Sequence, residues 1–170
     1  MAHPRTTFDA FVSGNAESLL RTAHLVTMDE GEAEDLVQDC LLVISQHWRR
    51  VGAMDQPLAY ARRVLINLAV RGGTKRSRRR AELDATPVEP AAESAAIALI
   101  GTRDELWTAL RNLTLRQRAV LVLRYFHDLS EAQTARILEC TPKTVSSTSS
   151  RSLTQLRELI EPAAPERSCR

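Results

Sequence analysis

The sequence predicts an all-α fold made of two small helical domains. Every periodic segment repeats its apolar residues at the three- and four-residue spacing of an amphipathic helix, and no stretch alternates apolar and polar residues as a strand does. Of the 170 residues, 44% are hydrophobic and only 4% aromatic, enough for one medium core or two small ones. An acidic stretch in the middle of the chain favours two small cores, one in each domain.

The first domain is predicted over residues 1–80 and contains three helical regions. The first is expected to break near Gly14-Asn15, and Asp29 is the expected N-cap of the second. A loop at 52–57 separates the second region from a third helix that begins near Leu58. The residues expected to face inward are Phe8, Phe11, Val12, Leu19, Leu20, Ala23, Val37, Cys40, Leu41, Ile44, Trp48, Val51, Ala61, Val64, Leu65 and Leu68.

The third helix leads into a strongly basic block. Between Arg71 and Arg80 there are six Lys or Arg residues and no acid. Such a block is typical of a protein that binds a polyanion, although a solvated, fraying helix end has the same composition. Residues 81–101 then carry four acids, no base and two prolines, and we expect them to form a flexible linker.

The second domain is predicted over residues 102–161. Thr102-Arg103-Asp104-Glu105 has the pattern of a capping box, so a helix is expected to start at Thr102. The next helix is expected to turn Leu115, Ala119, Val122, Leu123 and Phe126 inward. Residues 162–170 contain two prolines and are expected to be a disordered tail.

Residues 129–156 predict a helix-turn-helix. Ser130 and Gln133 form a capping box at the start of its first helix, and Thr141-Pro142 has the pattern of a cap and first position for its second. The inward residues are expected to be Leu129, Ala132, Ala135, Leu138, Val145, Ser149, Ser152, Leu153, Leu156 and Ile160.

The outward side of the second helix carries groups that suit DNA. Hydroxyl and basic side chains of this size reach base edges and phosphates in a major groove. An ordinary αα-hairpin with a solvated polar face has the same pattern. The outward residues are Lys143, Thr144, Ser146, Ser147, Ser150 and Arg151.

The cysteines and histidines predict neither a metal site nor catalysis. Cys40, Cys140 and Cys169 are widely spaced, with no C-x-x-C pair, so no disulfide framework, zinc site or other cofactor is expected. We expect Cys40 and Cys140 to be small buried hydrophobes rather than redox sensors. His24, His47 and His127 fall in different segments with no partner motif, which argues against an enzyme. The chain lacks a bilayer-length apolar run and a signal-peptide core, so it is expected to be cytosolic.

A series of motifs runs in order from Phe8 to Leu159. In the first domain they are Leu19–Ala23, Ala33–Gln38, Trp48, Tyr60–Val64 and Asn67-Leu68; in the second they are Leu106-Trp107, Arg116–Val120, Leu123–Tyr125, Asp128–Glu131, Thr144-Val145 and Ser150-Arg151. In this order, with an acidic linker between the domains, the chain resembles the extracytoplasmic-function (ECF) sigma factors of bacteria, in the actinobacterial style.

The resemblance implies a dissociable subunit of RNA polymerase with no catalytic chemistry or cofactor of its own. The helix carrying Glu34, Asp35 and Gln38 would dock on the clamp helices of the largest subunit of core RNA polymerase. The positive N-terminal end of a helix also favours Glu34 and Asp35, but that effect does not account for Gln38. Many members of the group are held inactive by an anti-sigma factor, which makes such a protein a candidate partner.

The resemblance also assigns promoter DNA to both domains. The third helix and the loop before it would melt the −10 element and capture an unpaired base, and the helix-turn-helix would bind the duplex −35 element. By this resemblance Asn67 matches a position that lines the base pocket, and its amide offers a donor and an acceptor to a base edge. The residues implied in holding the −10 strand are Arg62, Arg63, Arg71, Lys75 and Arg76.

The chain departs from the group at four places. Gly72-Gly73 stands where many members have Trp or another aromatic residue, and Glu139 replaces the usual glycine of the helix-turn-helix turn. Lys143 replaces a glycine and Ser146 a lysine, so the promoter sequence does not carry over. A free-standing helix-turn-helix regulator is the alternative. It accounts for residues 102–160 but leaves the basic third helix and the Ala33–Gln38 motif without a role.

Overall fold

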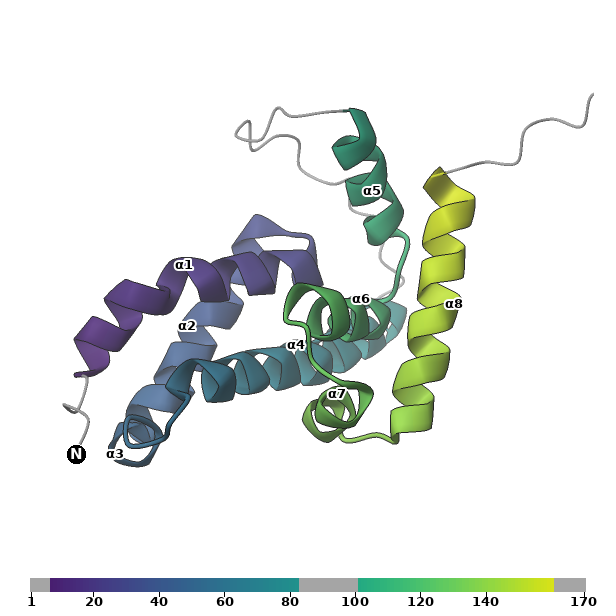
Figure 1. Cartoon of the computed structure of the whole chain (residues 1–170). Helices are drawn as coiled ribbons and strands as arrows, with labels where there is room; N and C mark the ends of the chain where they lie inside the picture. Colours follow the sequence, from purple (N-terminus) through teal and green to yellow (C-terminus); the bar gives the residue numbers. More distant parts are fainter. Residues whose placement is uncertain (1–6, 83–100, 161–170) are drawn as a thin grey trace, which may run out of the picture.

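The computed structural model describes residues 7–82 and 101–160, with side chains described at 7–73 and 104–160. Every regular element within these ranges is helical (Figure 1), which confirms the predicted all-α class. The greater part of the predicted linker, residues 83–100, and the predicted tail lie outside the described residues. Among the described residues, no helix combines the length and apolarity that crossing a bilayer requires.

The described part of the N-terminal domain consists of α1 (Phe8–Thr27), α2 (Glu30–Gln46), the short α3 (Trp48–Val51) and α4 (Pro57–Glu82). Asp29 caps α2 as predicted, because its Oδ1 accepts the N–H of Glu32 at 2.8 Å. The break expected near Gly14-Asn15 is wrong. The Asn15 amide donates to the Phe11 carbonyl one turn back at 2.8 Å, and α1 continues unbroken.

The C-terminal domain consists of α5 (Gly101–Arg111), α6 (Leu115–Leu121), the π-helical turn η1 (Val122–Phe126), α7 (Glu131–Leu138) and α8 (Pro142–Ile160). The cap predicted at Thr102 is wrong, since α5 already includes Gly101. A complete capping box stands instead at Thr114 and Gln117, before α6. Likewise α4 extends to Glu82, so the first two residues of the predicted linker are helical.

The π-helical turn explains why Phe126 does not face inward as expected. Its wider turn is closed by the bond from the His127 N–H to the Val122 carbonyl at 3.0 Å, five residues back. The extra residue rotates the end of the helix relative to an α-helical stripe. Phe126 is 52% exposed as a result, whereas Leu123 is fully buried.

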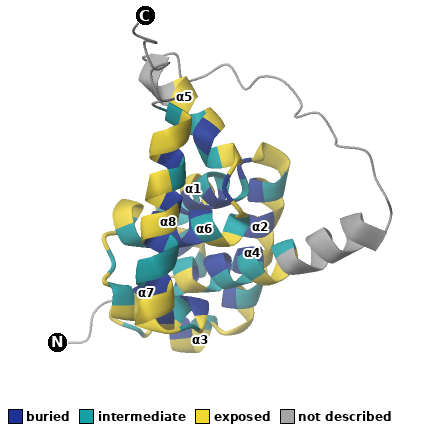
Figure 2. Ribbon diagram, turned by 90° about the vertical axis from the view of Figure 1, so that its right-hand side faces the viewer, coloured by how far each residue is buried: buried dark blue, intermediate teal, exposed yellow. Residues whose placement is uncertain are grey.

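One continuous apolar core joins the two domains. Leu19 and Leu65 of the N-terminal domain belong to the same buried cluster as Leu123 and Val145 of the C-terminal domain. Helix α6 contacts both α1 and α4, and α7 also packs on α4. Figure 2 shows buried residues on the facing sides of these helices. The described parts of the chain therefore form a single packed body, with the helix-turn-helix against α4.

Candidate nucleic-acid interface

Local sequence fixes the geometry of the helix-turn-helix. The capping box at Ser130 and Gln133 starts α7, as predicted. Glu139 ends α7 in the left-handed conformation (φ 52°), where its N–H and that of Cys140 both bond to the Ala135 carbonyl. Thr141 then caps α8, because its Oγ1 accepts the N–H of Thr144 at 3.1 Å.

The buried side of α8 largely follows the predicted stripe. Val145, Ser149 and Ser152 are buried, and the Ser149 hydroxyl donates to the Tyr125 hydroxyl at 3.3 Å. Leu153, expected to face inward, is 40% exposed. Ala132 of α7 is exposed as well, and Thr134 is buried in place of an apolar residue. Both helices thus pack through a narrower stripe than the apolar pattern implied.

The polar side of α8 is accessible at its N-terminal half. The exposed residues include Lys143, Thr144, Ser150 and Arg151, while Ser146 and Ser147 are half-buried. The Thr144 hydroxyl pairs with that of Thr141 at 2.9 Å, and the Ser147 hydroxyl donates to the Thr144 carbonyl. Basic side chains on an exposed helix end adjoining a tight turn fit the contact of a recognition helix with a major groove.

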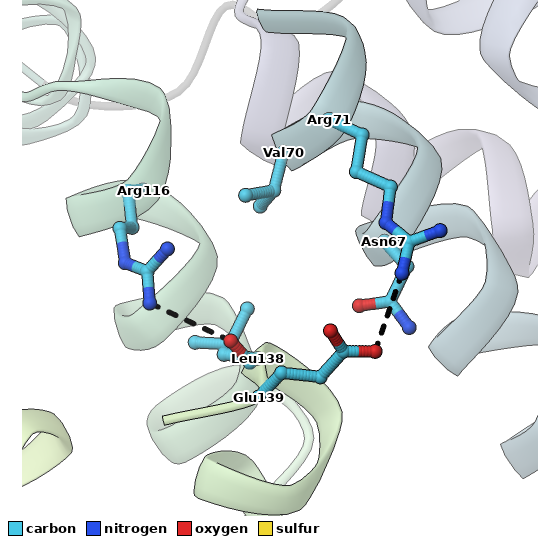
Figure 3. Close-up of a pocket in the computed structure, with 6 residues that line it drawn as sticks. All are labelled: Asn67, Val70, Arg71, Arg116, Leu138 and Glu139. Carbon is cyan, nitrogen blue, oxygen red and sulfur yellow. Dashed lines mark hydrogen bonds and ion pairs between the residues drawn. The ribbon is translucent and has the colours of Figure 1, made fainter. Parts of the chain in front are cut away.

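A second polar surface lies on α4 and faces the helix-turn-helix. Arg63, Asn67 and Arg71 follow at four-residue spacing, so they share one side of the helix. Asn67 and Arg71 line a cavity of about 270 Å³ between the domains, together with Val70, Arg116, Leu138 and Glu139. Figure 3 shows this cavity, in which Arg71 Nη2 lies 3.3 Å from a carboxylate oxygen of Glu139.

The other basic residues predicted for the −10 strand are placed differently. Arg63 is exposed, whereas Arg62 is half-buried and donates to the Ser18 hydroxyl of α1 at 3.1 Å. Burial lowers the pKa of Arg62 below its ordinary value. Lys75 and Arg76 lie in α4, and their side chains fall outside the described residues.

A buried polar cluster beside Arg62 connects α1 to η1. The Thr22 hydroxyl donates its one proton to the Ser18 carbonyl at 2.9 Å, so His127 Nε2, 3.1 Å away, is the donor to Thr22 Oγ1. Burial, and secondarily the charge of Arg62, lower the pKa of His127 to about 4. The imidazole is therefore a neutral structural group of the domain interface.

A third polar surface lies on α2, away from the cavity. Glu34, Asp35 and Gln38 are exposed, while Val37 and Cys40 on the other side are buried. Leu42 is 59% exposed and, one turn beyond Gln38, lies on the same face. Leu42 was not predicted as a surface residue, because it falls outside the apolar stripe of this helix and no motif marks it. A single exposed leucine is common on protein surfaces, so the position of Leu42 beside Gln38 is what makes it a candidate contact.

The remaining histidines and cysteines do not assemble into a site. His24 packs edge-on against Trp107, and His47 Nδ1 contacts the Val43 carbonyl. Cys40 is a buried hydrophobe as predicted, with its thiol 3.3 Å from the Ala61 carbonyl and a pKa raised by burial to about 12. Cys140 is half-buried, and Cys169 lies outside the described residues. Within the described ranges, no group of three metal-ligating side chains gathers.

Comparison with known proteins places this geometry in a family. Residues 103–156 match the model of sigma-70, region 4. The RNA polymerase sigma-E factor of Streptomyces avermitilis is 32% identical to the chain over 162 residues, covering 95% of this chain and 89% of the relative. The chain belongs to the sigma-70 family, among its ECF sigma factors. The sigma-E factor of Streptomyces coelicolor is also 32% identical, over 89% of this sigma factor and 84% of its own length.

A solved structure gives the same view of the fold. The sigma factor RpoE of Bartonella quintana, in a co-crystal structure with the anti-sigma factor NepR, matches with a TM-score of 0.71 at 24% identity. The match covers 92% of this sigma factor and 98% of that chain. The likeness therefore spans both helical domains rather than the helix-turn-helix alone.

Proposed function

We propose that this sigma factor binds core RNA polymerase in the cytoplasm, recognises −10 and −35 promoter elements and promotes DNA melting at the start of transcription. The polymerase carries the chemistry, and the sigma factor acts by binding. One observation carries the proposal: a single chain presents an exposed recognition helix on one domain and the Arg63–Asn67–Arg71 face on the other. Two such faces suit two separated promoter elements.

The α8 surface is proposed to bind the duplex −35 element. Lys143 and Arg151 supply positive charge for phosphates, and Thr144, Ser146, Ser147 and Ser150 supply hydroxyls of a size that reaches base edges. Because Lys143 lies in the first turn of α8, where the helix dipole also attracts anions, we assign it to a phosphate.

The α4 surface is proposed to hold the melted −10 strand. Asn67 offers one donor and one acceptor to the edge of a flipped base, and Arg63 and Arg71, one turn away on either side, flank it with positive charge. We propose Lys75 and Arg76, further along α4, for the same strand. Arg62 is assigned there by family resemblance, although its guanidinium is bonded to Ser18 in this structure.

The α2 surface is proposed to dock on core RNA polymerase through Glu34, Asp35, Gln38 and Leu42. Its three polar side chains and an exposed leucine, one turn beyond Gln38, share a face of a helix whose opposite side is buried. Because the solved relative was crystallised with an anti-sigma factor, we include such a protein among the candidate partners of this chain.

Selection of DNA from a random duplex library distinguishes this function from that of a free-standing regulator. The chain mixed with purified core polymerase should retain fragments that share two separated motifs, while core polymerase alone should not. A regulator that acts without polymerase would enrich one short motif equally well in the presence and absence of core enzyme, and that result would contradict the proposal.

A further inference from the structure

The centre of the outward face of α8 is occupied by a serine. Ser147 comes two residues after Val145 and two before Ser149, so at about 100° per residue it lies almost opposite both. Val145 and Ser149 are buried against the rest of the domain. Lys143 and Arg151, one turn away in either direction, are exposed. A duplex that contacts this face of α8 therefore meets the Ser147 side chain between the two cations.

The hydroxyl of Ser147 has already donated its proton. Its Oγ donates to the Thr144 carbonyl at 3.1 Å, one turn back in the same helix. A serine hydroxyl has one proton and two lone pairs, so the group that Ser147 presents to a ligand is an acceptor. Donation to the carbonyl also polarises the hydroxyl and strengthens it as an acceptor.

The neighbouring hydroxyls are not fixed in this way. Within the part of the chain that the structure describes, the hydroxyls of Ser146 and Ser150 have no protein partner, so each can donate or accept. The hydroxyls of Thr144 and Thr141 lie 2.9 Å apart, and either can be the donor. Of the four hydroxyls that the proposed function assigns to the −35 element, that of Ser147 is the one with a defined polarity.

Base edges in the major groove differ in polarity too. The exocyclic amines of adenine and cytosine are donors, whereas N7 of the purines, O6 of guanine and O4 of thymine are acceptors. When Ser147 meets an amine, a hydrogen bond is added to the one with Thr144. When it meets an acceptor, the hydroxyl must turn away from the Thr144 carbonyl, so one hydrogen bond replaces another. The amine is therefore favoured by the free energy of about one hydrogen bond.

We infer that Ser147 reads an exocyclic amine of adenine or cytosine in the −35 element, accepting from the amine while its own proton stays on the Thr144 carbonyl. The inference rests on the proposed binding of α8 to that element. Each base pair has one such amine in the major groove, on one strand only. Ser147 thus distinguishes the two orientations of a pair, A·T from T·A and C·G from G·C, by about two- to ten-fold in affinity.

The test uses holoenzyme reconstituted from core RNA polymerase and the full chain. Selection from a random duplex library gives the −35 motif for the wild type, Ser147→Ala and Thr154→Ala. Thr154 is the matched control, because its hydroxyl donates to the Ser150 carbonyl, also at 3.1 Å, but lies two turns further from the end of α8 that enters the groove. Ser147→Ala should lose the base preference at one position, and Thr154→Ala should lose none.

Base analogues at that position then determine the polarity. One duplex carries purine for adenine, or pyrimidin-2-one for cytosine, and so lacks the amine. A second duplex carries a 7-deazapurine and so lacks the N7 acceptor. In competition with the parent duplex, loss of the amine should weaken binding to the wild-type holoenzyme about two- to ten-fold more than binding to the Ser147→Ala holoenzyme. Loss of N7 should affect the two holoenzymes equally.

Three results would overturn the inference and leave the proposed function intact. They are an unchanged motif with Ser147→Ala, an equal effect of amine removal on both holoenzymes, and an N7 effect confined to the wild type. A wild-type holoenzyme that selects no −35 motif at all would instead contradict the proposed function, and the inference with it.

Discussion

Arg118 and Val26 are 92 positions apart, yet the guanidinium Nε of Arg118 donates a 2.7 Å hydrogen bond to the Val26 carbonyl. Val26 lies in the last turn of α1, where carbonyls lack helical partners and a cation is favoured. A second nitrogen of the same guanidinium bonds the Leu110 carbonyl within α5 and the Leu113 carbonyl two residues beyond its end. One side chain, 8% exposed, therefore joins three helices from both domains.

Replacing Arg118 by Met should destabilise the chain strongly. The change leaves the Val26 and Leu113 carbonyls buried without their charged donor, at a cost of about 1.5 to 3 kcal/mol in the free energy of unfolding. Urea denaturation measures it. Arg21→Met is the control, because Arg21 is exposed and its only described ion pair, with Glu17, spans 4.0 Å; it should change stability by no more than about 0.5 kcal/mol. Equal losses would show that Arg118 is not a structural link.

Stability should fall as the pH is lowered from 6.5 toward 4, and His127 should be one cause. Its pKa is about 4 in the folded chain against an ordinary 6.5, so in this range the unfolded chain binds the proton and the folded chain does not. The contribution of His127 to stability is therefore fully present above pH 6.5 and is lost progressively as the pH falls to about 4. Besides Arg62, its neighbours are Thr22 and the ring of Phe126, neither of them charged in this range.

His127→Gln keeps a donor for Thr22 and removes the titration. Its unfolding free energy should fall less between pH 6.5 and 4 than that of the wild type, measured by urea denaturation across that range. Carboxylates contribute to both proteins alike, so the difference between the slopes isolates His127. Parallel pH profiles would mean that the imidazole is not held neutral at the interface.

Glu139→Gly should stabilise the helix-turn-helix. Glu139 adopts φ 52°, which strains an ordinary residue and suits glycine, and the expected gain is about 0.5 to 1 kcal/mol. The gain should appear as a higher denaturation midpoint, even though the contact with Arg71 is lost. Glu139→Ala is the comparison: it loses the same ion pair, keeps the strain, and should not be more stable than the wild type.

The α2 surface should be needed for polymerase binding and not for folding. Leu42→Ala, and separately Glu34→Lys with Asp35→Lys, should weaken binding to core RNA polymerase at least about ten-fold, in the range of interface hot spots. Circular dichroism and the denaturation midpoint should stay near those of the wild type, because these side chains are exposed. Leu20 of α1 was predicted to face inward but is 37% exposed, so Leu20→Ala is the control for Leu42. Undiminished co-purification with core enzyme would exclude this surface.

Asn67→Ala should lower promoter opening and relax selectivity at one −10 position. A well-placed amide contact discriminates against a wrong base by roughly 1 to 3 kcal/mol. Permanganate footprints and transcription from single-base promoter variants measure the two effects, while affinity for core polymerase should stay unchanged. Footprints and selectivity identical to those of the wild type would remove Asn67 from the base pocket.

Local signals made much of the fold predictable from sequence. The caps at Asp29, Ser130 and Thr141 depend on a side chain bonding a backbone group three residues away, and all three are confirmed. The π-helical turn was not predictable, because no residue type in Val122–Phe126 marks it, and its wider turn takes Phe126 out of the α-helical stripe. Thr102 shows the opposite failure, in which a good capping pattern lies within a helix that starts earlier.

The candidate surfaces were predictable as faces but not in their mutual arrangement. Helical spacing is enough to put Glu34, Asp35 and Gln38 on one side of α2. Spacing says nothing of contacts between residues 68 positions apart, such as Arg71 and Glu139. The half-buried bond of Arg62 to Ser18 was not predicted for the same reason, since an arginine in a basic helix is expected to face solvent until its neighbours are known.

Run-off transcription with purified core RNA polymerase on a library of promoter fragments tests the central claim most directly. The account predicts transcripts that require the added chain, that start at a fixed distance from shared −10 and −35 motifs, and that disappear when Glu34 and Asp35 are reversed to lysine. Transcription from the library that is the same with and without the chain would contradict it.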